Sequence, residues 1–130
     1  MARDARHATI LVADDNPDIL GHVRALLEIS GYAVITASNG EEALCIYERH
    51  QSQISLLLTD VAMPNINGFD LADRVLCVNP QLPVVFMSGS SGSACRGLEW
   101  IPKPFRPAEL VEKVSRTLQV NAASKEQGAR

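Results

Sequence analysis

Charged and hydroxyl side chains stand at the ends of four short apolar runs in this sequence. These residues are Asp14 and Asp15 after TILVA (9–13), Asp60 after ISLLLT (54–59), Ser88 at the end of PVVFMS (83–88), and Lys103 after Trp100-Ile101. Three carboxylates in one small site repel each other unless a cation is present, and a hard divalent cation such as Mg²⁺ takes carboxylate, carbonyl and water oxygens. With a lysine beside it, such a site can accept a phosphoryl group on one carboxylate, and Asp60 is the candidate nucleophile.

Each of these residues alone has an ordinary structural explanation. Asp14 or Asp60 could be a turn residue or a helix cap. Ser88 could form a local hydrogen bond at a strand end, and Lys103 could be a solvated surface lysine. The joint pattern favours a site, provided that the fold brings these strand ends together.

The elements that must position these residues alternate between apolar runs and segments of helical periodicity. Strands are predicted at 9–13, 32–37, 54–59, 83–88 and 100–101, and helices after Asn16-Pro17, after Ser38 or Asn39, before Asn79-Pro80, and from Pro107. This alternation predicts an α/β fold with a doubly wound parallel sheet, and the flavodoxin-like order 2-1-3-4-5 is the leading candidate. In that order the carboxyl ends of strands 1, 3, 4 and 5 meet at one edge, where ligands of such sheets bind.

One connection between strands is short. Eighteen residues separate Ala13 from Tyr32, but only 11 separate Ser88 from Trp100, and five of those are GSSGS (89–93). Parallel strands usually need a dozen or more residues, including a helix, to connect them. The helix expected here is therefore truncated or replaced by a loop, and residues 89–97 are predicted to be mobile.

Composition and length limit the function classes. The 130 residues, 46% of them hydrophobic, predict one domain at 9–119, an N-terminal arm at 1–8 and a flexible tail or linker at 120–130. A net charge of −3 and the absence of a long apolar run predict that this chain binds no nucleic acid and no membrane. No signal peptide is evident, which predicts a cytoplasmic location.

The three cysteines have no metal-ligand spacing and are odd in number, so they predict neither a zinc site nor a disulfide framework. Cys45 and Cys77 are predicted to be small core residues on helices, because free cysteine is often buried.

Four segments together resemble the receiver domains of the bacterial two-component response-regulator family. They are ILVADDNPDIL (10–20), LLLTDVAMPNINGFDL (56–71), VVFMSG (84–89) and KPF (103–105), and the resemblance extends to Gln119. It implies the CheY-like form of the flavodoxin-like fold, although the shortened connection departs from the usual family pattern.

The resemblance also implies roles for the residues at the strand ends. Asp60 matches the phosphoacceptor, and Asp14 and Asp15 match the acidic pair that holds Mg²⁺, with Asp15 the more direct ligand. The backbone carbonyl of Ala62 matches a further metal ligand. Mn²⁺ could substitute for Mg²⁺.

Three further residues match the family's switch and its phosphoryl-pairing group. Ser88 matches the switch hydroxyl, and Lys103 matches the lysine that pairs with the phosphoryl group, followed by a cis bond to Pro104. Trp100 matches the switch aromatic, with a plain core residue as the alternative.

The function implied by the resemblance is that of a phosphoacceptor module. It would take a phosphoryl group from a phosphohistidine of a histidine kinase or a histidine phosphotransfer domain, and signal to an unknown downstream effector. It would catalyse its own phosphorylation and dephosphorylation but turn over no external metabolite. Both a stand-alone response regulator and the receiver of a hybrid histidine kinase fit, as a monomer or weak dimer.

Other functions fit the residues less well. A haloacid-dehalogenase-type phosphohydrolase would need a second aspartate two residues after Asp60, where Ala62 stands. A binding module with a degenerate site is disfavoured because every expected charged group is present. A flavin site is disfavoured because the loop DDNPD (14–18) is acidic and lacks phosphate donors.

Overall fold

A computed structural model describes residues 8–89 and 98–128 of the chain, with side chains up to residue 120. Its centre is one five-stranded sheet of β1 (Thr9–Ala13), β2 (Ala33–Ala37), β3 (Ile54–Asp60), β4 (Val84–Ser88) and β5 (Trp100–Pro102). The strands lie in the order β2-β1-β3-β4-β5, and all neighbouring pairs are parallel. The predicted fold class and strand order are therefore confirmed.

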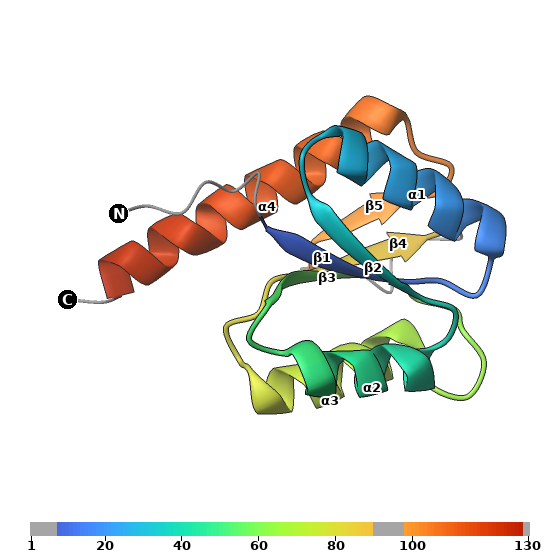
Figure 1. The fold of residues 1–130 in the computed structure, drawn as a ribbon, viewed down its shortest axis with the longest axis horizontal. Helices are drawn as coiled ribbons and strands as arrows, with labels where there is room; N and C mark the ends of the chain where they lie inside the picture. The colour runs from blue at the N-terminus through green and yellow to red at the C-terminus, as the bar shows by residue number, and fades with distance from the viewer. Residues whose placement is uncertain (1–7, 90–97, 129–130) are drawn as a thin grey trace.

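The described helices cover both faces of the sheet. They are α1 (Pro17–Ile29), α2 (Gly40–His50), α3 (Gly68–Val78) and α4 (Pro107–Gly128). Helices α1 and α4 lie on one face, and α2 and α3 lie on the other (Figure 1). Asparagine side chains at positions 16, 39 and 67 cap α1, α2 and α3 by accepting hydrogen bonds from first-turn amides, which fixes where each helix begins.

The central strands are buried on both faces, and their alternate side chains enter two different cores. Ile10 and Val12 pack with residues of α1 and α4, whereas Leu11 and Ala13 pack with residues of α2 and α3. This two-sided burial explains why the strands read as continuous apolar runs. It also holds their carboxyl ends, and the polar residues there, on a rigid base.

The prediction that Cys45 and Cys77 are core residues is wrong, because both are exposed. Cys45 lies two positions from each of the buried residues Ala43 and Tyr47, and Cys77 lies two positions after the buried Val75. Residues two apart on a helix point to nearly opposite sides. The position of each cysteine around its helix, and not the frequent burial of free cysteine, therefore determines that both side chains are exposed.

The last helix is longer than the sequence pattern indicates. Helix α4 continues to Gly128, whereas residues 120–130 were predicted to be a tail or linker. The segment from Asn121 contains alanine, lysine, glutamate and glutamine and no proline, so the helix can continue there. Whether this end is flexible stays a prediction, as does the N-terminal arm.

The predicted truncation between β4 and β5 concerns residues 89–97, of which 90–97 lie outside the described residues. Among the described residues, no helix stands between β4 and β5. The predicted mobility of this connection is not addressed by the structure. None of the helices described is both long and apolar enough to cross a membrane.

Candidate functional site

The carboxyl ends of β1 and β3 bring three carboxylates together. Oxygens of Asp14, Asp15 and Asp60 lie within 4.8 Å of one another. Asp14 is fully buried and Asp60 is 7% exposed, whereas Asp15 is exposed. Two carboxylates are thus held inside the sheet edge, and the third faces solvent above them.

Asp14 is held by the backbone around it. Its amide donates to the carbonyl of Ala37 at 3.1 Å, which ties it to the end of β2. Its Oδ1 accepts a hydrogen bond of 2.9 Å from the amide of Asn16, the residue that caps α1. The same Asn16 therefore starts the helix and orients a carboxylate of the site, whose other oxygen, Oδ2, accepts a hydrogen bond from Lys103.

Lys103 reaches this cluster from the end of β5. Its Nζ donates to Asp14 Oδ2 at 2.7 Å and lies 3.2 Å from Asp60 Oδ1. Its backbone amide donates to the carbonyl of Ser88 at 2.8 Å, which joins the ends of β4 and β5. The Lys103–Pro104 peptide bond is cis, as the resemblance implied. Asp14 and Asp60 therefore share one ammonium group.

Phe105 anchors the segment that carries Lys103. Its side chain packs against the core shared by α1 and α4, and its ring stacks on that of His22 in α1, with centroids 6.3 Å apart and planes at 16°. This packing fixes the backbone two residues after Lys103, so it contributes to placing the ammonium group.

The surroundings of Asp60 raise the pKa of its carboxyl group. Burial raises the pKa of Asp60, and the negative charges of Asp14 and Asp15 raise it further, while Lys103 opposes them through its charge and a hydrogen bond. Burial is the largest of these effects. A positive charge added beside Asp60 would therefore stabilise the ionised form of its carboxyl group and lower its pKa.

The backbone of Asp60 is packed as tightly as its side chain. The Thr59 hydroxyl donates to the Asp60 carbonyl oxygen at 2.9 Å. A Cβ on Gly68 would overlap that same oxygen, so only glycine fits there. Gly68 does not adopt a positive φ, and close approach to the site is therefore its role.

Ala62 lies in the loop between β3 and α3, two residues after Asp60, and is exposed. The loop begins with a hydrogen bond of 3.1 Å from the Val61 amide to the Met87 carbonyl. Met63 is buried in the core under α2 and α3. The loop is thus tied to β4 and to the core on either side of Ala62.

Ser88 and Trp100 lie differently with respect to the cluster. Ser88 is buried at the end of β4, and its neighbour Met87 pairs with Asp60 in the sheet, which places Ser88 at the same edge. Trp100 stands at the other end of β5, partly buried against Phe86 and Ala72. The structure brings Ser88 to the site edge and leaves Trp100 outside the carboxylate cluster.

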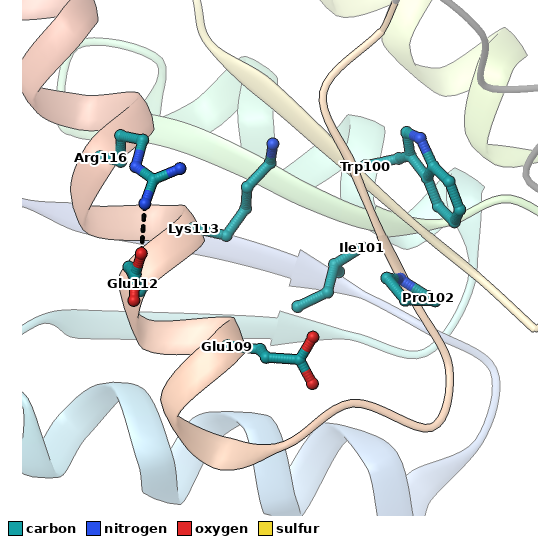
Figure 2. Close-up of a pocket in the computed structure, with 7 residues that line it drawn as sticks. All are labelled: Trp100, Ile101, Pro102, Glu109, Glu112, Lys113 and Arg116. Carbon is teal, nitrogen blue, oxygen red and sulfur yellow. Dashed lines mark hydrogen bonds and ion pairs between the residues drawn. The ribbon is translucent and has the colours of Figure 1, made fainter.

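A pocket of about 210 Å³ lies beside Trp100, between β5 and α4 (Figure 2). Lys113, which lines it, pairs with Glu99 at 2.5 Å, and Arg116 pairs with Glu112. Its described lining residues do not include the three carboxylates. The pocket is therefore a surface feature separate from the carboxylate cluster, and both of its basic side chains are paired with glutamates.

The donor chemistry of the cluster fits a hard divalent cation. Three carboxylates supply oxygen ligands, one of them exposed to water, and the described histidines and cysteines are not part of the group. Oxygen-only donors with room for water suit Mg²⁺. The residues that could hold such an ion are Asp14, Asp15 and Asp60, with the Ala62 carbonyl in the adjacent loop.

Sequence reasoning missed one residue beside the site, Gly40 at the start of α2. A Cβ on Gly40 would lie 2.5 Å from the carbonyl oxygen of Ile66, in the loop that carries Ala62. One signal in the sequence could have identified Gly40. It is a glycine in the first turn of a helix that Asn39 already caps, at a position where alanine would favour the helix more.

Known proteins with similar sequences carry the same type of domain. The family model described as "Response regulator receiver domain" matches residues 10–115. The transcriptional regulatory protein CpxR of Escherichia coli (strain K12) is 36% identical over 125 residues, which cover 91% of this chain and 52% of CpxR. The response regulator receiver protein CpdR of Brucella abortus (strain 2308) is 35% identical over 117 residues, which cover 84% of this chain and 95% of CpdR.

Solved structures agree. The receiver domain of the hybrid histidine kinase CckA superposes with a TM-score of 0.76 at 36% identity, covering 86% of this chain and all of that one (100%). The chain spans about half the length of CpxR, nearly all of CpdR and the whole of the CckA receiver. By sequence, by fold and by the residues at its strand ends, the chain belongs to the response regulator receiver domain family.

Proposed function

We propose that Asp60 is the phosphoacceptor of this receiver domain. The observation that carries the proposal is the position of Asp60, whose carboxylate lies in one cluster with Asp14 and Asp15 and 3.2 Å from the Lys103 ammonium. A carboxylate nucleophile needs both a cation and a fixed positive charge beside the phosphoryl oxygens, and this cluster offers places for both.

The reaction is a transfer between two side chains. An Asp60 carboxylate oxygen attacks the phosphorus of a phosphohistidine, and the new P–O bond forms as the P–N bond breaks. The electron pair of the P–N bond stays on the imidazole nitrogen, which then takes a proton from water. The chain accepts the group and later loses it to water, so it acts on itself and turns over no external metabolite.

The metal-binding residues in this proposal are Asp14, Asp15, Asp60 and the Ala62 carbonyl, with Mg²⁺ as the ion and Mn²⁺ as a substitute. A bound Mg²⁺ supplies positive charge beside the phosphoryl oxygens. Asp15, the exposed member, is the carboxylate most open to an ion arriving from solvent. Asp14 keeps Lys103 at the site through its 2.7 Å hydrogen bond.

Lys103 and Ser88 are proposed to hold the transferred group. The Lys103 Nζ, 3.2 Å from Asp60 Oδ1, would neutralise a phosphoryl oxygen on Asp60. Ser88, at the same sheet edge, is proposed to donate its hydroxyl to another oxygen. Ser88 lies on β4, which pairs with β5. A movement of Ser88 on phosphorylation would be transmitted through this pairing to Trp100 on β5, the proposed switch aromatic.

Receiver domains act with histidine kinases and with downstream effectors. For this chain we propose a histidine kinase or a histidine phosphotransfer domain as donor. CpdR and the CckA receiver support, respectively, a stand-alone regulator and the receiver of a hybrid kinase. Transcriptional control, as in the name of CpxR, would need a further domain. The cytoplasmic location and the monomeric or weakly dimeric state stay predictions.

Intact-mass measurement with a small-molecule phosphodonor tests the proposal. The wild-type chain incubated with phosphoramidate and Mg²⁺ should gain the mass of one phosphoryl group, and Asp60→Asn should gain none. No gain by the wild-type chain would favour a degenerate module. Rapid multiple turnover of phosphate esters would favour a hydrolase instead.

A further inference from the structure

The first turn of α2 is in close contact with the loop that follows the proposed phosphoacceptor. A Cβ built on Gly40 would lie 2.5 Å from the Ile66 carbonyl oxygen and 2.8 Å from Ile66 Cβ. Real side chains essentially never approach this closely, so the absence of a side chain at Gly40 permits the contact. A second, longer contact joins the same elements, since Asn65 Nδ2 donates to Glu41 Oε1 at 3.4 Å.

Helix formation does not explain the glycine at this position. Gly40 does not adopt the positive φ that favours glycine, and Asn39 already caps the helix through the amide of Glu42. Alanine would favour the helix more than glycine does. The space taken by Ile66 is therefore the physical reason for a glycine here.

The loop that contacts Gly40 packs at its other end against Asp60, a residue of the candidate site. The Gly68 amide donates to the Val61 carbonyl at 2.9 Å, and Gly68 packs directly against the Asp60 carbonyl. The Ile66 amide donates to the Pro64 carbonyl at 2.9 Å, which forms a tight turn within the loop. Asn65, just before Ile66, has a φ of 69°. Residues 61–67 are thus held between Gly40 and Asp60.

We propose that Gly40 is a positioning residue, and that its contact with Ile66 holds the 61–67 loop and with it the backbone of Ala62, two residues after Asp60. This inference rests on the proposed function, in which Ala62 is a metal ligand. A side chain at position 40 would push Ile66 away. Ile66 packs against the same core that contains the buried Met63, and Gly68 abuts Asp60 at the end of the loop. A shift of Ile66 would therefore be passed to Met63 and to its neighbour Ala62.

Gly40→Ala tests the contact, and the chain offers a matched control in Gly21→Ala. Gly21 lies in α1, and a Cβ there would meet no atom within 4 Å. Both changes add one methyl group to a helix, but only the first fills the space against Ile66. Two quantities are measured on the whole chain. The first is amide hydrogen exchange, and the second is the dissociation constant for Mg²⁺ without any phosphodonor, detected by Trp100 fluorescence or by calorimetry.

In Gly40→Ala we expect the amides of Ile66 and Gly68 to exchange faster, because their hydrogen bonds close the displaced loop. Mg²⁺ affinity should fall about 10-fold, the scale seen when groups that orient metal ligands are changed. Gly21→Ala should leave both quantities at wild-type values. Exchange and affinity in Gly40→Ala equal to those in Gly21→Ala would overturn the proposal, and so would faster exchange with unchanged affinity.

Ile66→Ala approaches the same contact from the loop and keeps the test decisive if Gly40→Ala does not fold. Removing the outer atoms of Ile66 loosens the contact without overpacking it, so faster exchange at Gly68 and weaker Mg²⁺ binding are again expected. Wild-type exchange and affinity in this variant would overturn the proposal. A wild-type chain that binds no Mg²⁺ would refute the proposed metal site. In that case, faster amide exchange in Gly40→Ala or Ile66→Ala would still show that the contact between Gly40 and Ile66 holds the loop.

Discussion

The ammonium of Lys103 lies 2.7 Å from Oδ2 of Asp14, a residue 89 positions earlier in the chain and itself fully buried. The contact joins the end of β5 to the end of β1, across the carboxyl edge of β3. Asp60 stands at that edge, 3.2 Å from the same ammonium group. One lysine thus balances two carboxylates, and the charge of the site depends on it.

Lys103→Met should slow phosphorylation of Asp60 by about 100-fold, the cost typical of removing one preorganised charge-stabilising group. The fixed positive charge beside the phosphoryl oxygens is then lost, while Asp14, Asp15 and Asp60 remain. The measurement is the time course of phosphoprotein by intact mass with phosphoramidate and Mg²⁺.

Lys113→Met is the matched control, because Lys113 pairs with Glu99 beside Trp100 and not with the carboxylate cluster. Its phosphorylation rate should equal that of the wild type. Equal rates in the Lys103 and Lys113 variants would contradict the role given to Lys103.

The raised pKa of Asp60 makes a prediction about stability and pH. The folded chain holds a proton on Asp60 more tightly than the unfolded chain, whose carboxyl has the ordinary value of 3.8. Stability is therefore lost as pH rises from this value through the folded pKa, and the ionised Asp60 opposes folding above it. Asp60→Asn, which cannot ionise, should have a larger free energy of unfolding than the wild type at neutral pH without metal.

Urea unfolding in a chelating buffer measures this difference. The advantage of Asp60→Asn should be largest near neutral pH and should shrink as the pH is lowered toward the ordinary carboxyl value. Added Mg²⁺ should reduce it as well, because an ion that binds the folded wild type stabilises that state. A wild-type chain more stable than Asp60→Asn at neutral pH without metal would show that burial does not disfavour the charge.

Tyr47→Phe should raise the free energy of unfolding by about 1 kcal/mol, because it removes a buried polar group that lacks a hydrogen bond. Tyr47 lies on the buried face of α2, and its hydroxyl has no hydrogen-bond partner among the described residues. Urea unfolding monitored by circular dichroism gives the difference. A loss of stability would mean that the hydroxyl makes a useful bond.

Ser88→Ala should separate phosphorylation from its signal. Trp100 is the single tryptophan of the chain, so intrinsic fluorescence reports on it alone. The wild type should change its fluorescence on phosphorylation; the variant should still take a phosphoryl group on Asp60, but this change should be lost. Ser115→Ala, on α4, is the control and should keep the change. A full change in Ser88→Ala would exclude Ser88 as the link to Trp100.

The sequence predicted the parts of the site that follow from strand ends. Asp14, Asp60 and Lys103 each come directly at the end of an apolar run, and parallel strands in the order 2-1-3-4-5 must bring such ends together. The structure places Asp60 as the last residue of β3 itself, rather than after it. What each residue does in the reaction stays a prediction until phosphorylation is measured.

Other features depend on packing that no local pattern contains. The contact of Gly40 with Ile66 joins residues 26 positions apart, and only the fold reveals that a side chain would not fit. Ile29 continues the apolar pattern of α1 yet is 85% exposed, because it lies two positions after the buried Leu27. The lack of a hydrogen-bond partner for the Tyr47 hydroxyl among the described residues is likewise apparent only from the folded structure.

The most direct test of the account is to locate the phosphoryl group within the chain. Borohydride reduces an aspartyl phosphate to homoserine, which can be assigned by peptide mass spectrometry. After incubation with phosphoramidate and Mg²⁺, homoserine should appear at position 60 and be absent without Mg²⁺. Homoserine at Asp14 or Asp15 with none at position 60, or no homoserine under any condition, would contradict the assignment of Asp60 as the phosphoacceptor.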